Sequence, residues 1–304
     1  TIQLPLVYHA SPEQIKDVEY IDKNTHFKHE NALLYVDSQP SELFDYTDIG
    51  PEKKYVMLVV EDNKELASFI SHHFSVIFKI KVAYNGEDAL EKIKKSPPDI
   101  IISDIMMPRI DGFTLCSLIK ESIETSHIPV ILLTAKSGDE SRIEGFYKGA
   151  DAYIEKPFNL KELDLIIRNI LRSKEKLRKH FATLNSFGET VGLLGNKDQM
   201  FIKKLTETVY RHLDDCNFEV GKLCNEVHVS RTLLHMKLKK ITGLSATEFI
   251  NNIRLNEAKK MLQEGSWTVS EVAYKVGYKD PAYFSKSFKK FFGKTPSEIV
   301  YINT

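Results

Sequence analysis

This chain of 304 residues has no excess charge of either sign, no long apolar run and no paired set of cysteines. Its 42 Lys and Arg residues balance 42 Asp and Glu residues, so no overall field points to a membrane or nucleic-acid partner. No apolar run approaches the roughly 20 residues that span a membrane, and we expect no membrane contact by this segment. Cys116, Cys216 and Cys224 are odd in number and widely spaced. They favour reduced thiols in a cytoplasmic protein over disulfides or a zinc site.

The length suits two domains with connections. Residues 53–172 alternate short apolar strands with amphipathic helices, whereas residues 200–304 have a helical pattern throughout. Residues 1–52 are mixed and aperiodic, which predicts a connector. Residues 173–199 begin as a charged helix and then loosen through glycines, which predicts a linker. Because the chain starts at Thr1 without Met, we expect it to be a piece of a longer protein.

Within residues 53–172 the pattern predicts five strands, at 55–60, 79–83, 99–103, 130–133 and 152–154. A helix is expected after each strand, the last four at 86–95, 112–122, 138–148 and 160–172. Five strand–helix units with short connections predict an α/β fold with a doubly wound, five-stranded parallel sheet.

Polar side chains stand at the ends of four of these strands. Glu61 and Asp62 follow the first, Asp104 follows the third, Thr134 ends the fourth and Lys156 follows the fifth. Ligands of such sheets bind beyond the carboxyl ends of the strands. The alternative is a set of ordinary solvated residues, but five at matching ends favour a common site.

Carboxylates in this position suit Mg²⁺, which prefers hard oxygen ligands and keeps several waters. The expected ligands are Asp62, Asp104, Glu61 through a water, and the main-chain carbonyl of Met106. A carboxylate beside such a cation can attack a phosphoryl group. Lys156 would then neutralise the incoming charge, and Thr134 would hydrogen-bond a phosphoryl oxygen.

The same positions carry a family resemblance. Glu61-Asp62, Asp104, Pro108, Gly112, Thr134-Ala135 and Lys156-Pro157-Phe158 resemble the flavodoxin-like receiver domain of bacterial response regulators, over about 120 residues. The resemblance implies that Asp104 takes phosphate from a histidine kinase with Mg²⁺, assisted by Thr134 and Lys156. It also implies a cis Lys156–Pro157 bond, and a switch role for Tyr153, whose alternative role is that of a half-exposed strand aromatic.

The last hundred residues predict an all-α domain, with helices at 201–215, 219–227, 230–242, 245–263, 269–276, 281–292 and 296–302. Ser245, Thr268 and Thr295 each stand three residues before a Glu, which is the spacing of a capping box. Asp280 precedes Pro281 at a helix start, and Gly265 suits a helix end.

Two pairs of these helices, 219–227 with 230–242 and 269–276 with 281–292, predict two helix-turn-helix motifs. The second helix of each pair has an apolar stripe, with basic and small polar residues on the remaining surface. Such a helix can lie in the major groove, although a single one is equally typical of a solvated surface. The candidate DNA-binding residues are Ser230, Arg231, Thr232, His235 and Lys239 in the first unit and Tyr283, Ser285, Lys286, Lys289 and Lys290 in the second.

This part of the chain resembles the AraC/XylS-type DNA-binding domain. The resemblance is carried by Ala258-Lys-Lys-Met-Leu262, Val272-Ala273, Val276-Gly277-Tyr278, Asp280-Pro281-Ala-Tyr-Phe284, Phe288-Lys-Lys290 and Gly293-Lys-Thr-Pro296. Two positions depart from the family pattern. Met236 stands where many relatives have Arg, and Ile299-Val300 replaces an aromatic–Arg pair.

The two resemblances together imply a phosphorylation-dependent transcription regulator that binds double-stranded DNA, pairs as a homodimer when phosphorylated, and is not itself an enzyme. The domain order is similar to the C-terminal part of hybrid two-component systems of Bacteroidetes, which suggests control of glycan-utilisation genes. Thr1–Leu6 resembles the closing strand of a kinase ATP-binding domain. Two alternatives remain open: a Mg²⁺-dependent phosphatase, and a receiver that only drains phosphate while DNA binding ignores it.

Overall fold

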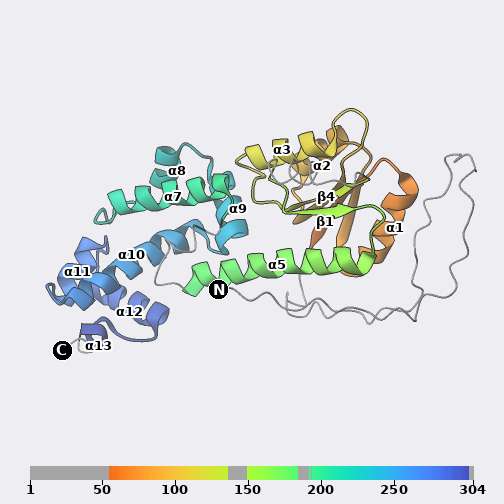
Figure 1. The fold of residues 1–304 in the computed structure, drawn as a ribbon. Coiled ribbons are helices and arrows are strands. Elements are labelled where there is room, and N and C mark those ends of the chain that lie inside the picture. Colours follow the sequence, from red (N-terminus) through yellow and green to blue (C-terminus); the bar gives the residue numbers. More distant parts are fainter. Residues whose placement is uncertain (1–54, 136–148, 184–191, 193, 301–304) are drawn as a thin grey trace, which may run out of the picture. The chain divides into compact units, whose positions relative to one another are not determined.

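The structure is a computed structural model that describes residues 55–135, 149–183, 192 and 194–300 (Figure 1). Several predicted segments lie outside these residues: the connector at 1–52 with its first strand, the helix at 138–148, most of the glycine-containing linker, and the end of the last helix. Within the described part, no helix combines the length and apolar character needed to cross a membrane.

The first half of the described chain forms a parallel sheet of five strands in the order β2-β1-β3-β4-β5, as the alternating pattern predicted. The strands are β1 (Val56–Val60), β2 (Lys79–Ala83), β3 (Ile100–Asp104), β4 (Val130–Thr134) and β5 (Ala152–Glu155). β3 and β4 are buried along their whole length, as continuous apolar runs in a parallel sheet require. The chain reverses its direction of winding between β1 and β3, and a crevice opens at such a point beyond the strand ends.

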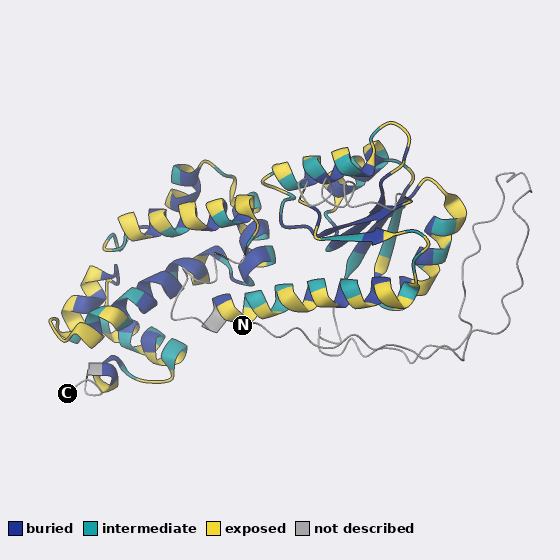
Figure 2. Ribbon diagram, viewed as in Figure 1, coloured by how far each residue is buried: buried dark blue, intermediate teal, exposed yellow. Residues whose placement is uncertain are grey.

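Helices cover both faces of this sheet (Figures 1 and 2). α2 (Gly86–Lys95) and α3 (Gly112–Glu121) pack on one face, where alternate strand residues such as Leu58, Ile101 and Leu132 form a buried cluster with them. α1 (Lys64–Phe74) and α5 (Leu160–Thr183) pack on the other, against the intervening residues. The two-residue period of a strand divides the apolar residues between the two cores.

Helix α5 belongs to two cores at once. Leu163, Ile167 and Leu171 pack under the sheet, whereas Phe181, near its end, is buried among the C-terminal helices. Its 24 residues span roughly 36 Å. α5 is therefore one continuous helix that includes residues 173–183, the charged segment that was predicted to follow the receiver domain.

The C-terminal part is helical throughout, as predicted. Its helices are α7 (Asn196–Arg211), α8 (Val220–Val227), α9 (Arg231–Thr242), α10 (Ala246–Glu264), α11 (Val269–Lys275), α12 (Pro281–Phe292) and α13 (Pro296–Val300). They enclose two clusters, one built on α7, α8 and α9 and one on α11, α12 and α13. α10 joins them, since Phe249 and Ile253 pack in the first cluster and Leu255 and Leu262 in the second.

The expected bounds of one helix were wrong. The helix expected at 201–215 begins at Asn196 and ends at Arg211. The chain turns after Arg211, and the ring of His212 stacks on Phe218 with centroids 4.6 Å apart. Apolar periodicity did not detect this turn, because Leu213 remains partly buried beyond the end of the helix.

The cap signals were confirmed. Ser245 and Thr268 form reciprocal capping boxes with Glu248 and Glu271, and Thr295 exchanges the same two hydrogen bonds with Glu298. Asp280 caps α12, with Pro281 in its first turn, and Gly265 ends α10 in the left-handed conformation.

Candidate functional site

The three acidic residues of the predicted site meet at the carboxyl edge of the sheet. Glu61 and Asp62 follow β1, and Asp104 ends β3, which pairs with β1. One carboxylate oxygen from each lies within 4.8 Å of the others. Glu61 and Asp104 are buried, whereas Asp62 is exposed. The site therefore has a protected floor and one acid that faces solvent.

Lys156, in the loop after β5, supplies the counter-charge. Its Nζ lies 2.9 Å from Oε2 of Glu61 and 3.1 Å from Oδ1 of Asp104. The peptide bond between Lys156 and Pro157 is cis, as the resemblance implied. Burial raises the pKa of Glu61, and the neighbouring Lys156 opposes that rise. The lysine thus holds two buried acids together.

Asp104 is also fixed by the main chain. Its Oδ1 accepts a hydrogen bond of 2.8 Å from the N–H of Ile105. Gly112, the first residue of α3, donates its N–H to the carbonyl of Ile105 at 2.9 Å. A Cβ atom at Gly112 would lie 2.1 Å from the carbonyl oxygen of Asp104. Glycine is therefore required for α3 to begin against this strand end. The Ile105 contact escaped sequence analysis, because every residue except proline carries an N–H.

Two further predicted residues, Thr134 and Tyr153, lie on the neighbouring strands β4 and β5. Thr134 ends β4 and is 1% exposed, and β4 pairs with β3 so that Leu133 stands beside Asp104. Tyr153 lies on β5 and is half-buried, and its Oη is shielded with no hydrogen-bond partner among the described residues. The side chain of Met106, two residues after Asp104, is 58% exposed.

The donor set fits Mg²⁺. Three carboxylates converge at the edge of the sheet, and hard oxygen atoms of this kind are the ligands that Mg²⁺ prefers. The exposed position of Asp62 leaves room for waters of hydration. Burial raises the pKa of Glu61, and the positive charge of a bound cation would act in the opposite direction by favouring the ionised carboxylate.

The candidate DNA-binding residues form the open surfaces of α9 and α12. Arg231, Thr232, His235 and Lys239 are exposed on α9, while Leu234, Leu238 and Ile241 are buried beneath. On α12, Phe284 and Phe288 are buried, and the exposed candidates are Tyr283, Lys286, Lys289 and Lys290. Figure 2 shows both helices with exposed and buried sides.

The two serine candidates are engaged within their own helices. The hydroxyl of Ser230 accepts a hydrogen bond from the N–H of Leu233 at 3.1 Å and so caps α9. The hydroxyl of Ser285 donates to the carbonyl of Pro281 at 2.9 Å. Both hydroxyl groups therefore already take part in a hydrogen bond within their own helix.

Two family models match the chain. Residues 57–168 match the response regulator receiver domain, and residues 223–300 match a helix-turn-helix domain. The first match contains the acidic site, and the second contains α9 and α12.

Curated relatives and a solved structure are similar to parts of this chain. Histidine kinase P4 of Formosa agariphila is 40% identical over 250 residues, which cover 82% of this chain and 18% of that protein. The probable transcriptional regulator ycf27 of Porphyra purpurea is 34% identical over 153 residues, or 49% of this chain and 62% of that protein. The solved Francisella response regulator 1452 receiver domain is 39% identical, covers 40% of this chain and 99% of its own, and has a TM-score of 0.36. The chain spans less than two thirds of either curated relative.

Proposed function

Because this chain is a two-component response regulator that joins a receiver domain to an AraC-type helix-turn-helix domain, we propose that phosphorylation of Asp104 controls its binding to promoter DNA. The observation that supports the proposal is the placement of Asp104, which is held at 3.1 Å from Lys156 and within reach of Glu61 and Asp62.

The chemistry assigned to this site is phosphoryl transfer. One carboxylate oxygen of Asp104 attacks phosphorus in the phosphohistidine of a kinase. A P–O bond forms, the P–N bond breaks, and the histidine leaves with its electron pair. Lys156 neutralises charge on the phosphoryl oxygens, and Thr134 donates a hydrogen bond to one of them.

Glu61, Asp62, Asp104 and the carbonyl of Met106 would hold the Mg²⁺, which supplies positive charge to the incoming phosphoryl group when bound. Glu61 shares Lys156 with Asp104, so a substitution of either acid would remove one of the two carboxylates that pair with the lysine.

The proposed response is pairing of two chains. Tyr153 and Thr134 would re-set when the phosphoryl group is present, and a face that includes β5 and α5 would pair. The predicted helix at 138–148, a further part of that face, lies outside the described residues. Each DNA-binding domain would place α9 and α12 in successive turns of the major groove, about 34 Å apart. Pairing doubles the phosphate contacts and raises the effective concentration of the second domain.

A substitution of the phosphate acceptor tests this function. Duplexes selected from a random library by the chain with acetyl phosphate would serve as probes in fluorescence anisotropy. Asp104→Ala should abolish donor-stimulated binding, whereas Glu91→Ala, an exposed carboxylate on α2, should retain it. In sedimentation experiments, chains that retain Asp104 should form pairs after phosphorylation. Asp104→Ala chains should not.

The same experiment separates the alternatives. Binding by Asp104→Ala that is still stimulated by the donor would remove the proposed control. If the unsubstituted chain binds DNA in a salt-dependent way and acetyl phosphate does not change its affinity, the receiver would instead only accept and release phosphate. The receiver and helix-turn-helix domains fit a non-enzymatic regulator. Steady turnover of a small phosphate ester would instead favour a phosphatase, although Met106 stands where a second acid would be expected to act.

The wider assignment follows from kinship. We propose that this chain is part of a longer hybrid histidine kinase, because 82% of the chain is similar to 18% of the length of a histidine kinase. We place this part of it in the cytoplasm, where a kinase and promoter DNA are both accessible. Glycan-utilisation genes are the proposed targets, and promoter binding sites mapped across the genome would test that assignment.

A further inference from the structure

A lysine of α9, the first of the two helices proposed to enter the major groove, is buried against the receiver domain. Lys237 lies on α9, and its side chain is 0% exposed. Its Nζ donates to the carbonyl of Ile123 at 2.5 Å, the hydroxyl of Ser126 at 2.8 Å and Oδ1 of Asp198 at 2.7 Å. Ile123 and Ser126 belong to residues 122–128, which lie between α3 and β4, whereas Asp198 is on α7. The lysine thus joins three segments that are distant in sequence.

Ser126 completes the cluster. Its hydroxyl also donates to Asp198 at 2.6 Å, so Ser126, Asp198 and Lys237 each contact the other two. The ring of Phe201 lies 5.3 Å from the ammonium group. A buried charge is tolerated where it is paired and its donors are satisfied. These contacts therefore describe a fitted interface rather than a chance collision of surfaces.

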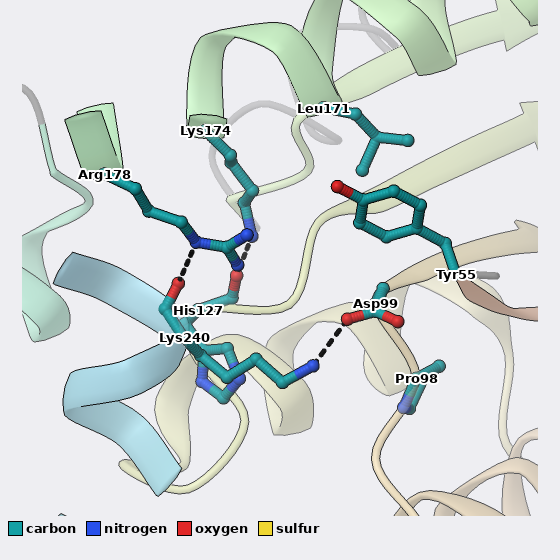
Figure 3. Close-up of a pocket in the computed structure, with 8 residues that line it drawn as sticks. All are labelled: Tyr55, Pro98, Asp99, His127, Leu171, Lys174, Arg178 and Lys240. Atoms are coloured by element: carbon teal, nitrogen blue, oxygen red, sulfur yellow. Dashed lines mark hydrogen bonds and ion pairs between the residues drawn. The ribbon is translucent and has the colours of Figure 1, made fainter. Parts of the chain in front are cut away.

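A second lysine of α9 continues the interface one turn further (Figure 3). Nζ of Lys240 lies 2.5 Å from Oδ1 of Asp99, and the guanidinium of Arg178 donates to the carbonyl of Lys240 at 2.9 Å. The other oxygen of Asp99 accepts from the N–H of Val56 at 2.9 Å. Both the receiver and the long helix α5 therefore hold α9.

The interface lies at the amino-terminal ends of the strands, whereas the proposed phosphorylation site lies at their carboxyl ends. Asp99 precedes β3, and residues 122–128 precede β4. Asp104 stands at the other end of β3, about 15 Å away along the strand. Docking of α9 therefore leaves the acidic site accessible to a phosphodonor.

The side of α9 that meets the receiver is not the side with the DNA-binding candidates. At 3.6 residues per turn, His235 and Lys239 project roughly 160° from Lys237. Both remain exposed in the docked arrangement, as do Arg231 and Thr232. The candidate DNA-binding residues of α9 are therefore accessible while another side of the same helix contacts the receiver.

We propose that residues 122–128 and Asp99 of the receiver are a docking surface for α9, and that the docked arrangement is the one that binds DNA. The receiver then supports the first reading helix instead of masking it, and activation by pairing requires no release of that helix. This inference rests on the proposed function for its DNA-binding part, whereas docking itself can be measured without DNA.

Charge reversal across the ion pair tests the proposal. Asp99→Lys and Lys240→Glu each place like charges together, and the double substitution restores an opposite pair. Each single variant should bind selected duplex about tenfold more weakly than the parent. The double variant should recover most of the affinity, which also shows that the single variants do not lose affinity merely because they misfold.

The direction of each change in affinity separates docking from simple charge attraction and from masking. Attraction of DNA to positive charge predicts tighter binding by Asp99→Lys and weaker binding by Lys240→Glu. Masking of α9 by the receiver predicts tighter binding by both variants. Either pattern, or no change in both, would overturn the proposal. Glu91→Lys on α2 and Lys203→Glu on α7 are controls that make the same charge changes at exposed positions.

Hydrogen exchange provides the measurement without DNA. Amides in residues 122–128 and 231–242 should exchange faster in each single variant and slow again in the double variant. If the parent chain does not bind duplex DNA but the double variant shows this rescue of hydrogen exchange, docking stands and the proposed function fails. Unchanged exchange in both single variants would refute docking itself.

Discussion

Replacing Gly112 by alanine is expected to destabilise the receiver, although alanine is the better helix former. Gly112 begins α3, and helix propensity alone predicts a gain of up to about 1 kcal/mol. The new Cβ would lie 2.1 Å from the carbonyl oxygen of Asp104 and 2.8 Å from Cα of Ile105. Both atoms belong to the backbone, so a side-chain rotation cannot relieve the overlap. We expect a net loss of about 3 kcal/mol, the upper part of the range for overpacking.

Gly221 on α8 is the matched control. It also lies in the first turn of a helix, and nothing approaches its Cβ position within 4 Å. Gly221→Ala should therefore be neutral or stabilising by up to about 1 kcal/mol.

Urea unfolding followed by far-UV circular dichroism measures both substitutions. Fluorescence of Trp267, the only tryptophan, reports on the C-terminal helices separately. Gly112→Ala should lower the receiver transition and slow phosphate uptake at Asp104, because α3 and the strand end must move apart. A Gly112→Ala chain as stable as the parent would refute the close approach of α3 to this strand.

Three further changes test other parts of the structure. Burial lowers the pKa of Lys174 to about 7, so the unfolded chain binds more protons above that pH and stability should rise with pH from about 7 to 10.5. Lys174→Met should flatten this rise in urea midpoints measured across that range; an unchanged slope would contradict the assignment. Ser245→Ala removes the cap that meets the N–H of Glu248 and should cost about 1 kcal/mol in thermal unfolding; no loss would show that the cap contributes nothing. Gly277→Ala should cost roughly 2–4 kcal/mol by Trp267 fluorescence, since φ is +76° and the Cβ would lie 2.5 Å from the carbonyl of Leu213; full stability would exclude this turn geometry.

Regular elements were predictable wherever local chemistry decided them. The strands were found because continuous apolar runs bounded by polar residues suit a parallel sheet. The starts of α10 and α11 were found because Ser245 and Thr268 carry a reciprocal cap within four residues. The end of α7 at Arg211 was missed, because the stacking of His212 on Phe218 depends on how the chain turns back.

The acidic site was predictable for a topological reason. Parallel strands place their carboxyl ends at one edge, so Glu61, Asp62 and Asp104 had to be neighbours once the sheet was recognised. The detailed contacts were not predictable. The bond from Lys156 to Glu61, and the N–H of Ile105 on Asp104, depend on side-chain and main-chain directions in the folded state.

The sequence by itself determined the two domain types, the strand-end acids and the two helices α9 and α12 with their exposed basic residues, because period, capping and residue type act over short distances. Only the tertiary structure decided what Lys237 does. In sequence it is one of several lysines on α9, with nothing to mark it as buried. Its acceptors, Ile123, Ser126 and Asp198, are 114, 111 and 39 residues away. Such contacts are formed by packing of separate elements, and no local pattern encodes them.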